Sequence, residues 1–261
     1  MYSQLTIIKP VGCAMLDLAD VSFQLAEKPI VNKASVRFEA GQITGLIGPN
    51  GAGKTTLLKL AAGLLAPQHG EVALAGADFA DPQARAQHIA YMPQFQSVAW
   101  PLSCRDVVGL GLMPFGPVVP ERIDAALAQC GAAAFAARSI DTLSGGERAR
   151  VHMARLLVGG APILLLDEPV QSLDAAGALA VMAVLRQAAD NGHCVVLVLH
   201  DLHLAAQFCD ALVLMNEGQI CSQGAPSEVL SPDRLAPIFK VEFDAVSLAD
   251  RQVLIARPHT G

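Results

Sequence analysis

The fold of this chain is decided by residues 43–56, which read Ile43-Thr44-Gly45-Leu46-Ile47-Gly48-Pro49-Asn50-Gly51-Ala52-Gly53-Lys54-Thr55-Thr56. The apolar run at 43–47 predicts a buried strand, and residues 54–63 predict a helix. Between them lies a match to G-x-x-x-x-G-K-[ST], in the strand–loop–helix context that this motif requires. Glycines let the backbone turn tightly and approach a polyphosphate, and the free N–H groups of a helix start attract anions. The stretch therefore predicts a phosphate-binding loop.

Lys54 and Thr55 carry the chemistry of this loop. In such loops the lysine reaches the β- and γ-phosphates, and the hydroxyl binds Mg²⁺. A second candidate pair, Asp167 and Glu168, ends the apolar run 163–166. A carboxylate at the C-terminal end of a buried strand lies where α/β sheets bind ligands. Asp167 therefore suits Mg²⁺, and Glu168 suits a group that orients or deprotonates an attacking water; a helix-capping acid is the alternative interpretation.

A second helix start lies at Leu143-Ser144-Gly145-Gly146-Glu147. Ser144 is a favourable N-cap, the two glycines permit close approach, and residues 148–157 continue as a helix. This is an anion-binding helix start without a strand before it. A chain with one complete phosphate loop has no evident need for another, so we infer that this segment serves a phosphate held by a second copy of the chain.

Short apolar segments alternate with helical ones, which predicts an α/β fold with a mostly parallel sheet and right-handed crossovers. The expected strands are 43–47, 163–166, 195–199 and 212–215, and the expected helices are 54–63, 175–189 and 202–208. At the edges, residues 14–40, 71–75 and 241–254 alternate like antiparallel strands.

The middle of the chain breaks this alternation. From about 82 to 157 the pattern is mainly helical, with one short strand at 88–92 and a Pro/Gly-rich loop at 113–120. We expect a single domain over 1–261, in which a helical subdomain of about 95–157 is inserted into the α/β core. A short β extension is expected at about 240–257.

Composition narrows the function classes. Hydrophobic residues make up 52% of the 261 residues and the formal charge is −6, which excludes a disordered chain. No stretch approaches the roughly 18–20 uncharged apolar residues of a membrane-spanning helix. The six cysteines are scattered without a CxxC pair, which argues against zinc and a disulfide framework. An acidic chain with one tryptophan and two tyrosines is a poor candidate for nucleic-acid binding.

Together these motifs amount to a family resemblance. The chain resembles ABC-type ATPases, the nucleotide-binding subunits of ATP-binding-cassette transporters. The motifs that carry it occur in the family's order over nearly the whole chain: GPNGAGKTT at 48–56, Gln94, LSGGE at 143–147, ILLLDE at 163–168, Ser172-Leu173-Asp174 and His200. LSGGE is highly specific to that family. The resemblance implies a P-loop NTPase fold, ATP and Mg²⁺ as ligands, and ATP hydrolysis coupled to transmembrane transport.

The resemblance also implies roles for single residues. Gln94 would be the Q-loop glutamine that contacts Mg²⁺ and the attacking water, and Asp174 the D-loop aspartate at the dimer interface. His200 would contact the γ-phosphate. Phe23 falls where the family has an aromatic ring that stacks on adenine, although a phenylalanine in an alternating segment is more often a core residue. The other expected nucleotide contacts are Gly48, Pro49, Asn50, Gly51, Ala52, Gly53, Lys54, Thr55 and Thr56, with Ser144, Gly145, Gly146 and Glu147 from the second copy.

Partners follow from the same resemblance. Two copies would pair head to tail with two ATP molecules between them, on integral membrane permease subunits and indirectly with a substrate-binding protein. This implies a peripheral location at the cytoplasmic face of the inner (plasma) membrane. The apolar segment 95–115, with Phe95 and Trp100, is the expected contact surface for the permease; subdomain core is the alternative interpretation of these two residues.

Several stretches narrow the group within the family. Residues 101–108, 198–206, 224–230 and 235–239 resemble the ATPases of iron-siderophore, haem and cobalamin importers, which indicates uptake of a metal chelate. The alternative function is a soluble ABC ATPase of a cytosolic assembly machine, such as iron–sulfur cluster biogenesis. A DNA-repair ATPase would need a long coiled-coil insertion or a basic face, which the sequence lacks. A pseudo-ATPase is disfavoured because the catalytic residues are present.

Two features depart from the family's usual pattern. Glu147 stands where many members have glutamine, and Val170-Gln171 stands where threonine or a small residue is usual.

The histidines have competing interpretations. A metal site at His200, Asp201 and His203 is disfavoured, because residues i and i+3 at a strand end do not reliably converge. The remaining candidates are interpreted as solvated or core residues: His88, His152 and His193.

Overall fold

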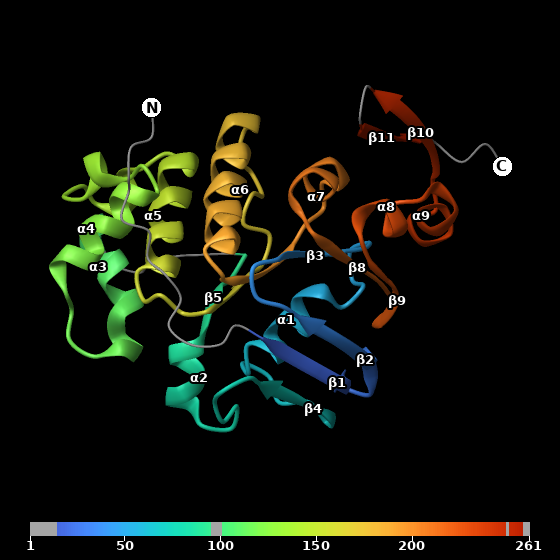
Figure 1. Cartoon of the computed structure of the whole chain (residues 1–261), viewed down its shortest axis with the longest axis horizontal. Helices are drawn as coiled ribbons and strands as arrows, with labels where there is room; N and C mark the ends of the chain where they lie inside the picture. Colours follow the sequence, from blue (N-terminus) through green and yellow to red (C-terminus); the bar gives the residue numbers. More distant parts are fainter. Residues whose placement is uncertain (1–14, 95–100, 249–250, 258–261) are drawn as a thin grey trace. The chain divides into compact units, whose positions relative to one another are not determined.

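The strand, loop and helix expected from residues 43–56 are all present. The computed structural model describes residues 15–94, 101–248 and 251–257, and Figure 1 labels its helices and strands. Strand β3 (Ile43–Ile47) is buried along its whole length, and helix α1 (Lys54–Ala61) follows the glycine loop. The helix ends earlier than expected because Gly63 adopts a left-handed conformation (φ 66°), the usual way to stop a helix.

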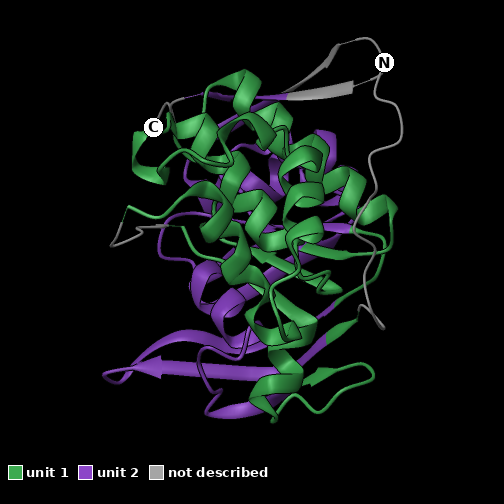
Figure 2. Cartoon of the chain, turned by 90° about the vertical axis from the view of Figure 1, so that its left-hand side faces the viewer, with its two compact units in different colours: residues 1–16, 38–42, 73–195 green, residues 17–37, 43–72, 196–261 purple. Residues whose placement is uncertain are grey.

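The described chain divides into two compact units, each built from several segments of sequence (Figure 2). Unit 1 comprises residues 1–16, 38–42 and 73–195, and unit 2 comprises residues 17–37, 43–72 and 196–261. Strand β7 (Cys194–Val198) crosses from the first unit into the second.

Unit 2 contains the phosphate-loop candidate. Strand β3 pairs in parallel with β8 (Ala211–Asn216), and β9 (Gln219–Gly224) continues antiparallel to β8. A second sheet has the order β2-β1-β4, formed by β1 (Leu16–Leu25), β2 (Lys28–Phe38) and β4 (His69–Leu74). The unit also holds α7 (Leu202–Phe208), α8 (Pro226–Val229), α9 (Pro232–Phe239) and the antiparallel pair β10 (Glu242–Leu248) and β11 (Arg251–Arg257).

Unit 1 contains the carboxylate candidates. Strand β5 (Ile89–Met92) pairs in parallel with the fully buried β6 (Ile163–Leu166), and the register places Met92 opposite Leu166. Its helices are α2 (Pro82–His88), α3 (Cys104–Gly109), α4 (Pro120–Gln129), α5 (Gly145–Leu157) and α6 (Ala175–Asp190), with 3₁₀ turns η1 (Leu110–Phe115), η2 (Ala133–Phe135) and η3 (Ile140–Thr142). Helices α3, α4 and α5 pack together through buried side chains such as Val107, Ile123 and Val151.

The α/β fold, the mostly parallel strands and the antiparallel edge are confirmed. The expected loop at 113–120 is wrong in its first part, because residues up to Phe115 belong to the 3₁₀ turn η1. Helices α2, α8 and α9 and strand β9 were not expected. Helix α2 had a recognisable start, since Asp81 accepts a hydrogen bond from the Gln83 amide and Pro82 occupies the first turn. Among the described residues, no helix is both long and apolar enough to cross a membrane.

Two glycines in the helical part of unit 1 give a matched test of packing. A Cβ at Gly111 would lie 2.2 Å from the backbone oxygen of Arg155, whereas a Cβ at Gly109 would meet two side-chain atoms, Ile123 Cδ1 at 3.4 Å and Val118 Cγ1 at 3.9 Å. We predict that Gly111→Ala lowers the free energy of unfolding by about 2 kcal/mol or more, because backbone must move. Gly109→Ala should be neutral or stabilising by up to ~1 kcal/mol. Urea unfolding of both variants checks this, and equal stabilities would contradict the close approach.

Candidate functional site

The loop between β3 and α1 is held close to neighbouring backbone. A Cβ at Gly48 (φ 142°) would lie 2.1 Å from the Met215 oxygen, and one at Gly53 (φ 100°) would lie 2.5 Å from the Ile30 oxygen. Only glycine fits these two positions. The Gly218 amide also donates to the Ala52 oxygen at 3.0 Å. The loop is therefore fixed on both sides by strands of unit 2.

Lys54 begins α1 and is only 5% exposed. Its ammonium donates hydrogen bonds to the backbone oxygens of Gly48 at 2.7 Å and Pro49 at 2.9 Å. A buried ammonium is stable only when it is paired or hydrogen-bonded, and here the loop's own backbone supplies acceptors. Gly51 lies at the outer part of the loop with nothing within 4 Å of its Cβ position. The loop thus combines a held cation with exposed backbone, as phosphate binding requires.

The two carboxylates follow β6 in unit 1. Asp167 is 2% exposed, and its amide continues the pairing of the strands by donating to the Met92 oxygen at 2.9 Å. Glu168 is half-buried and adopts a left-handed backbone conformation (φ 52°), which is unusual for a residue with a side chain. Burial of the phenol, with a smaller contribution from the negative charge of Asp167, raises the pKa of Tyr91 to about 12.

Gln94 lies beside this carboxylate pair. Its Nε2 donates to Glu168 Oε2 at 2.9 Å and to Gln171 Oε1 at 3.0 Å. Gln94, Asp167, Glu168 and Gly145 all line one cavity of about 240 Å³ in unit 1. The structure therefore brings together the expected Q-loop glutamine, the strand-end carboxylates and the start of α5.

Ser144 is the N-cap of α5, as expected. Its hydroxyl accepts from the Glu147 amide at 3.3 Å, and Glu147 Oε2 accepts from the Ser144 amide at 2.9 Å. This reciprocal pair is a capping box. The hydrogen bond from the Ser144 amide is the main cause that lowers the pKa of Glu147. Because Ser144 and Gly145 are exposed, this helix start is accessible to an anion.

The remaining expected residues occupy their own elements. Asp174 is exposed and caps α6 by accepting from the Gly177 amide at 2.7 Å. Phe23 is half-buried on β1, and His200 is exposed directly after β7. Asp201 is the N-cap of α7 and accepts from the amides of His203 at 2.8 Å and Leu204 at 3.1 Å.

His152 is a residue of this region that the sequence did not single out as functional. It lies on α5 between the cavity of about 240 Å³ and a second cavity of about 200 Å³, and it lines both. It is 5% exposed, and neither ring nitrogen has a hydrogen-bond partner among the described residues. Burial, with smaller contributions from Arg155 and Arg148, lowers its pKa to about 4. Arg148 and Arg155 lie on the same face of α5, one turn to either side.

Comparison with known proteins identifies the family. The family described as "ABC transporter" matches residues 31–171. The hemin import ATP-binding protein HmuV of Pseudomonas entomophila is 39% identical over 238 residues, covering 87% of this chain and 93% of that protein. This chain belongs to the ABC transporter family.

Another ABC relative is the cobalamin import ATP-binding protein BtuD of Halobacterium salinarum, 41% identical over 232 residues. This alignment covers 86% of the chain but only 58% of that relative's length. Among solved structures, a metal-chelate type ABC transporter in an inward-facing conformation has a TM-score of 0.82 at 22% identity, covering 94% of this chain and 98% of that one. A dimeric bacterial ABC transporter cassette has a TM-score of 0.73 at 24% identity, covering 81% and 98%. The expected ABC ATPase fold is thus confirmed.

The buried His152 gives a pH-dependent prediction. Between pH 6.5, its ordinary pKa, and about 4 the unfolded chain binds a proton that the folded chain does not. The free energy of unfolding should therefore fall as the pH falls from 6.5 to about 4. Below that pH both states bind the proton, and His152 causes no further loss. Between pH 7 and pH 4.5 we predict that wild type loses about 2–3 kcal/mol more than His152→Gln. His69→Gln, at an exposed histidine of β4, is the control for urea unfolding at both pH values. Equal losses in wild type and His152→Gln would contradict the burial of a neutral imidazole.

Proposed function

We propose that this chain is the ATP-binding and ATP-hydrolysing subunit of an ABC importer, and that the cargo is a metal chelate of the haem, cobalamin or siderophore class. The hydrolysis proposal rests on one observation: Gln94 donates to Glu168 at the end of β6, one residue after the buried Asp167. The cargo class is supported by two relatives, a hemin import and a cobalamin import ATP-binding protein. The whole chain, 1–261, would act as one ATPase domain, with the helical subdomain at about 95–157 and the β extension at about 240–257.

The residues fit ATP and Mg²⁺ chemically. Lys54 and the backbone of residues 48–56 would bind the phosphates, and His200 and Phe23 would contact the γ-phosphate and the adenine. Mg²⁺ prefers oxygen ligands, and the Thr55 hydroxyl, the Gln94 amide oxygen and the Asp167 carboxylate would each supply one. When bound, Mg²⁺ neutralises charge on the phosphates. Glu168 would accept the proton of the attacking water, and Gln94 would orient that water.

The second helix start, formed by Ser144, Gly145, Gly146 and Glu147, would serve the ATP held by a second copy of the chain, because one phosphate loop leaves no evident need for another anion site in the same copy. In the proposed head-to-tail dimer, the exposed start of α5 in one copy faces the ATP on the loop of the other, and Asp174 lies at the interface. The capping box leaves the Gly145 and Gly146 amides free of the Ser144 side chain. A solved cassette of similar fold is dimeric, which supports the pairing of two copies.

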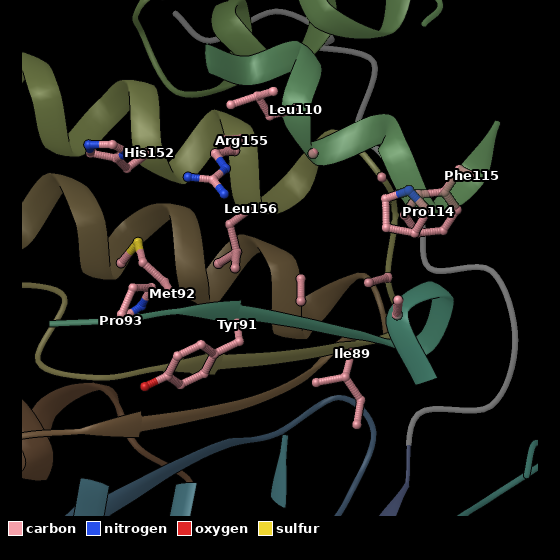
Figure 3. A pocket seen from close by; sticks show the side chains of 15 residues that line it. Ile89, Tyr91, Met92, Pro93, Leu110, Pro114, Phe115, His152, Arg155 and Leu156 are labelled. Atoms are coloured by element: carbon pink, nitrogen blue, oxygen red, sulfur yellow. The ribbon is translucent and has the colours of Figure 1, made fainter. Parts of the chain in front are cut away.

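A groove of about 200 Å³ in unit 1 is the proposed contact surface for the permease. Figure 3 shows its lining, with Tyr91 from β5, Arg155 from α5 and Phe115 from η1. Both ring nitrogens of His152 and the hydroxyl of Tyr91 are buried in its lining and have no hydrogen-bond partner among the described residues. Unsatisfied buried polar groups are costly, so an occupant that supplies hydrogen bonds would be favoured. The expected contact residues Phe95 and Trp100 lie outside the described residues.

Through the permease, the chain would act at the cytoplasmic face of the membrane, peripherally, with a substrate-binding protein on the far side of the transporter. No contact with nucleic acid is proposed. The cytosolic assembly-machine alternative has no supporting observation among the described residues.

The hydrolysis proposal predicts distinct defects for two variants. Glu168→Gln keeps the size of the side chain but removes the basic carboxylate, so ATP binding should persist while turnover falls at least ~10²-fold. Lys54→Ala should instead weaken nucleotide binding itself. Titration with fluorescent ATP and steady-state phosphate release separate the two effects. Near-normal turnover of Glu168→Gln would remove Glu168 from the role of general base.

The composite-site proposal predicts complementation between two inactive variants. Ser144→Arg should bind ATP but fail to complete the partner's site, and Lys54→Ala should fail to bind ATP in its own loop. Mixing them can assemble one intact site per dimer, built from the wild-type Lys54 loop of one copy and the wild-type Ser144 of the other. ATPase activity of the mixture should exceed that of either variant alone. If the mixture is as inactive as its components, the head-to-tail arrangement is wrong.

The groove proposal predicts a separation of binding from hydrolysis. Leu110 lines the groove and is 38% exposed, so Leu110→Glu should fold and keep basal ATPase activity but weaken co-purification with the membrane subunits at least ~30-fold. The equivalent charge changes in Gln96–Ser103 should act alike. Val118→Glu, exposed and outside the groove lining, is the control. Normal co-purification of Leu110→Glu places the contact elsewhere, and loss of folding would show that these residues are core.

A further inference from the structure

Gln171 lies one tight turn after Glu168. The Gln171 amide donates to the Glu168 oxygen at 3.2 Å, which closes a turn of four residues. The left-handed backbone at Glu168 (φ 52°) and at Ser172 (φ 63°) fixes the direction of this segment. As a result the side chains of Glu168 and Gln171 present two oxygen acceptors on the same side of the turn, and both contact Gln94.

The two acceptors use both hydrogens of one amide group. Gln94 Nε2 has two N–H bonds, and they are directed at Glu168 Oε2 (2.9 Å) and Gln171 Oε1 (3.0 Å). A flipped Gln94 would place its carbonyl oxygen against the Glu168 carboxylate, two acceptors without a donor, even if the Gln171 amide also flipped and donated to Gln94. The network therefore selects one orientation of the amide, in which Oε1 of Gln94 is the atom left to act as an acceptor or ligand.

We propose that Gln171 is a positioning residue that fixes the Gln94 amide, so that its nitrogen faces Glu168 and its oxygen faces away. The expected effect on the rate rests on the proposed ATPase function, whereas the orientation of the Gln94 amide rests only on its hydrogen bonds. Gln171 is exposed and touches neither Asp167 nor the phosphate loop in any described hydrogen bond, so it acts through Gln94.

Glu168 alone restrains only one of the two N–H groups. Without Gln171 the Gln94 side chain can rotate about its terminal torsion, which is broad for an amide, while keeping a single hydrogen bond. The oxygen of Gln94 is then less well directed. Loss of one such hydrogen bond corresponds to a few-fold to about tenfold change in rate, and the change should appear in kcat, because the ATP-binding residues are untouched.

The kinetic test compares three variants. Gln171→Leu, similar in size but without an acceptor, should lower kcat about 3–10-fold with KM for ATP changed less than twofold. Gln171→Glu restores an acceptor and should recover kcat to within about threefold of wild type. Gln83→Leu, at an exposed glutamine of α2 whose side chain makes no described hydrogen bond, should be silent. In a Gln94→Ala background, Gln171→Leu should have no further effect, because the residue it positions is gone.

A second readout does not depend on hydrolysis. With ¹⁵N-labelled glutamine, the side-chain amide protons of Gln94, assigned with Gln94→Ala, should both be protected from exchange in wild type. Gln171→Leu should expose one of them, and Gln83→Leu neither.

If wild type hydrolyses no ATP, the proposed function fails while the exchange measurement still decides the orientation. The positioning role is overturned if Gln171→Leu leaves the exchange of the Gln94 amide protons unchanged. It is also overturned if Gln171→Leu lowers kcat equally in the wild-type and the Gln94→Ala backgrounds.

Discussion

The burial of the Lys54 ammonium is the constraint on which the site depends. A buried ammonium at the N-terminus of a helix needs hydrogen-bond acceptors, and the backbone oxygens of Gly48 and Pro49 provide them. This requires the loop to fold back over the lysine, which in turn requires Gly48 and Gly53 to adopt positive φ against Met215 and Ile30. The conformation of the loop therefore depends on the positions of strands β8 and β2, which carry Met215 and Ile30. The backbone of the loop thus holds the Lys54 ammonium in place.

The second half of the chemistry depends on a different constraint, the left-handed turn after β6. A buried strand places Asp167 at its C-terminal end, and the left-handed turn at Glu168 redirects the chain so that the Glu168 carboxylate accepts a hydrogen bond from Gln94. Two helix starts follow the same logic of capping, Ser144 for α5 and Asp174 for α6. In each case a short polar side chain satisfies one amide, so the remaining free N–H groups stay available to an anion or a partner.

Much of this could be predicted from the sequence because the signals are local. The strand–loop–helix at 43–56, the carboxylates after β6 and the N-cap at Ser144 each depend on residues adjacent in the chain, and each is present. The Gln94–Gln171 hydrogen bond could not be predicted, since it joins residues 77 apart and depends on the turn at Glu168. The sequence could not show whether His152 is buried or exposed, because its helical neighbours Arg148 and Arg155 are charged residues that usually face solvent. Helix α9 was missed because two prolines, Pro232 and Pro237, lie within it.

The central claim is that each nucleotide site is built from two copies of the chain. The measurement that tests it most directly is an experimental structure of Glu168→Gln with ATP and Mg²⁺, in which hydrolysis is blocked. The account predicts a dimer with two nucleotides, each contacted by Lys54 of one copy and by Ser144 of the other. A nucleotide held by Lys54 and Ser144 of the same copy, or held in a monomer with Ser144 in solvent, would contradict it.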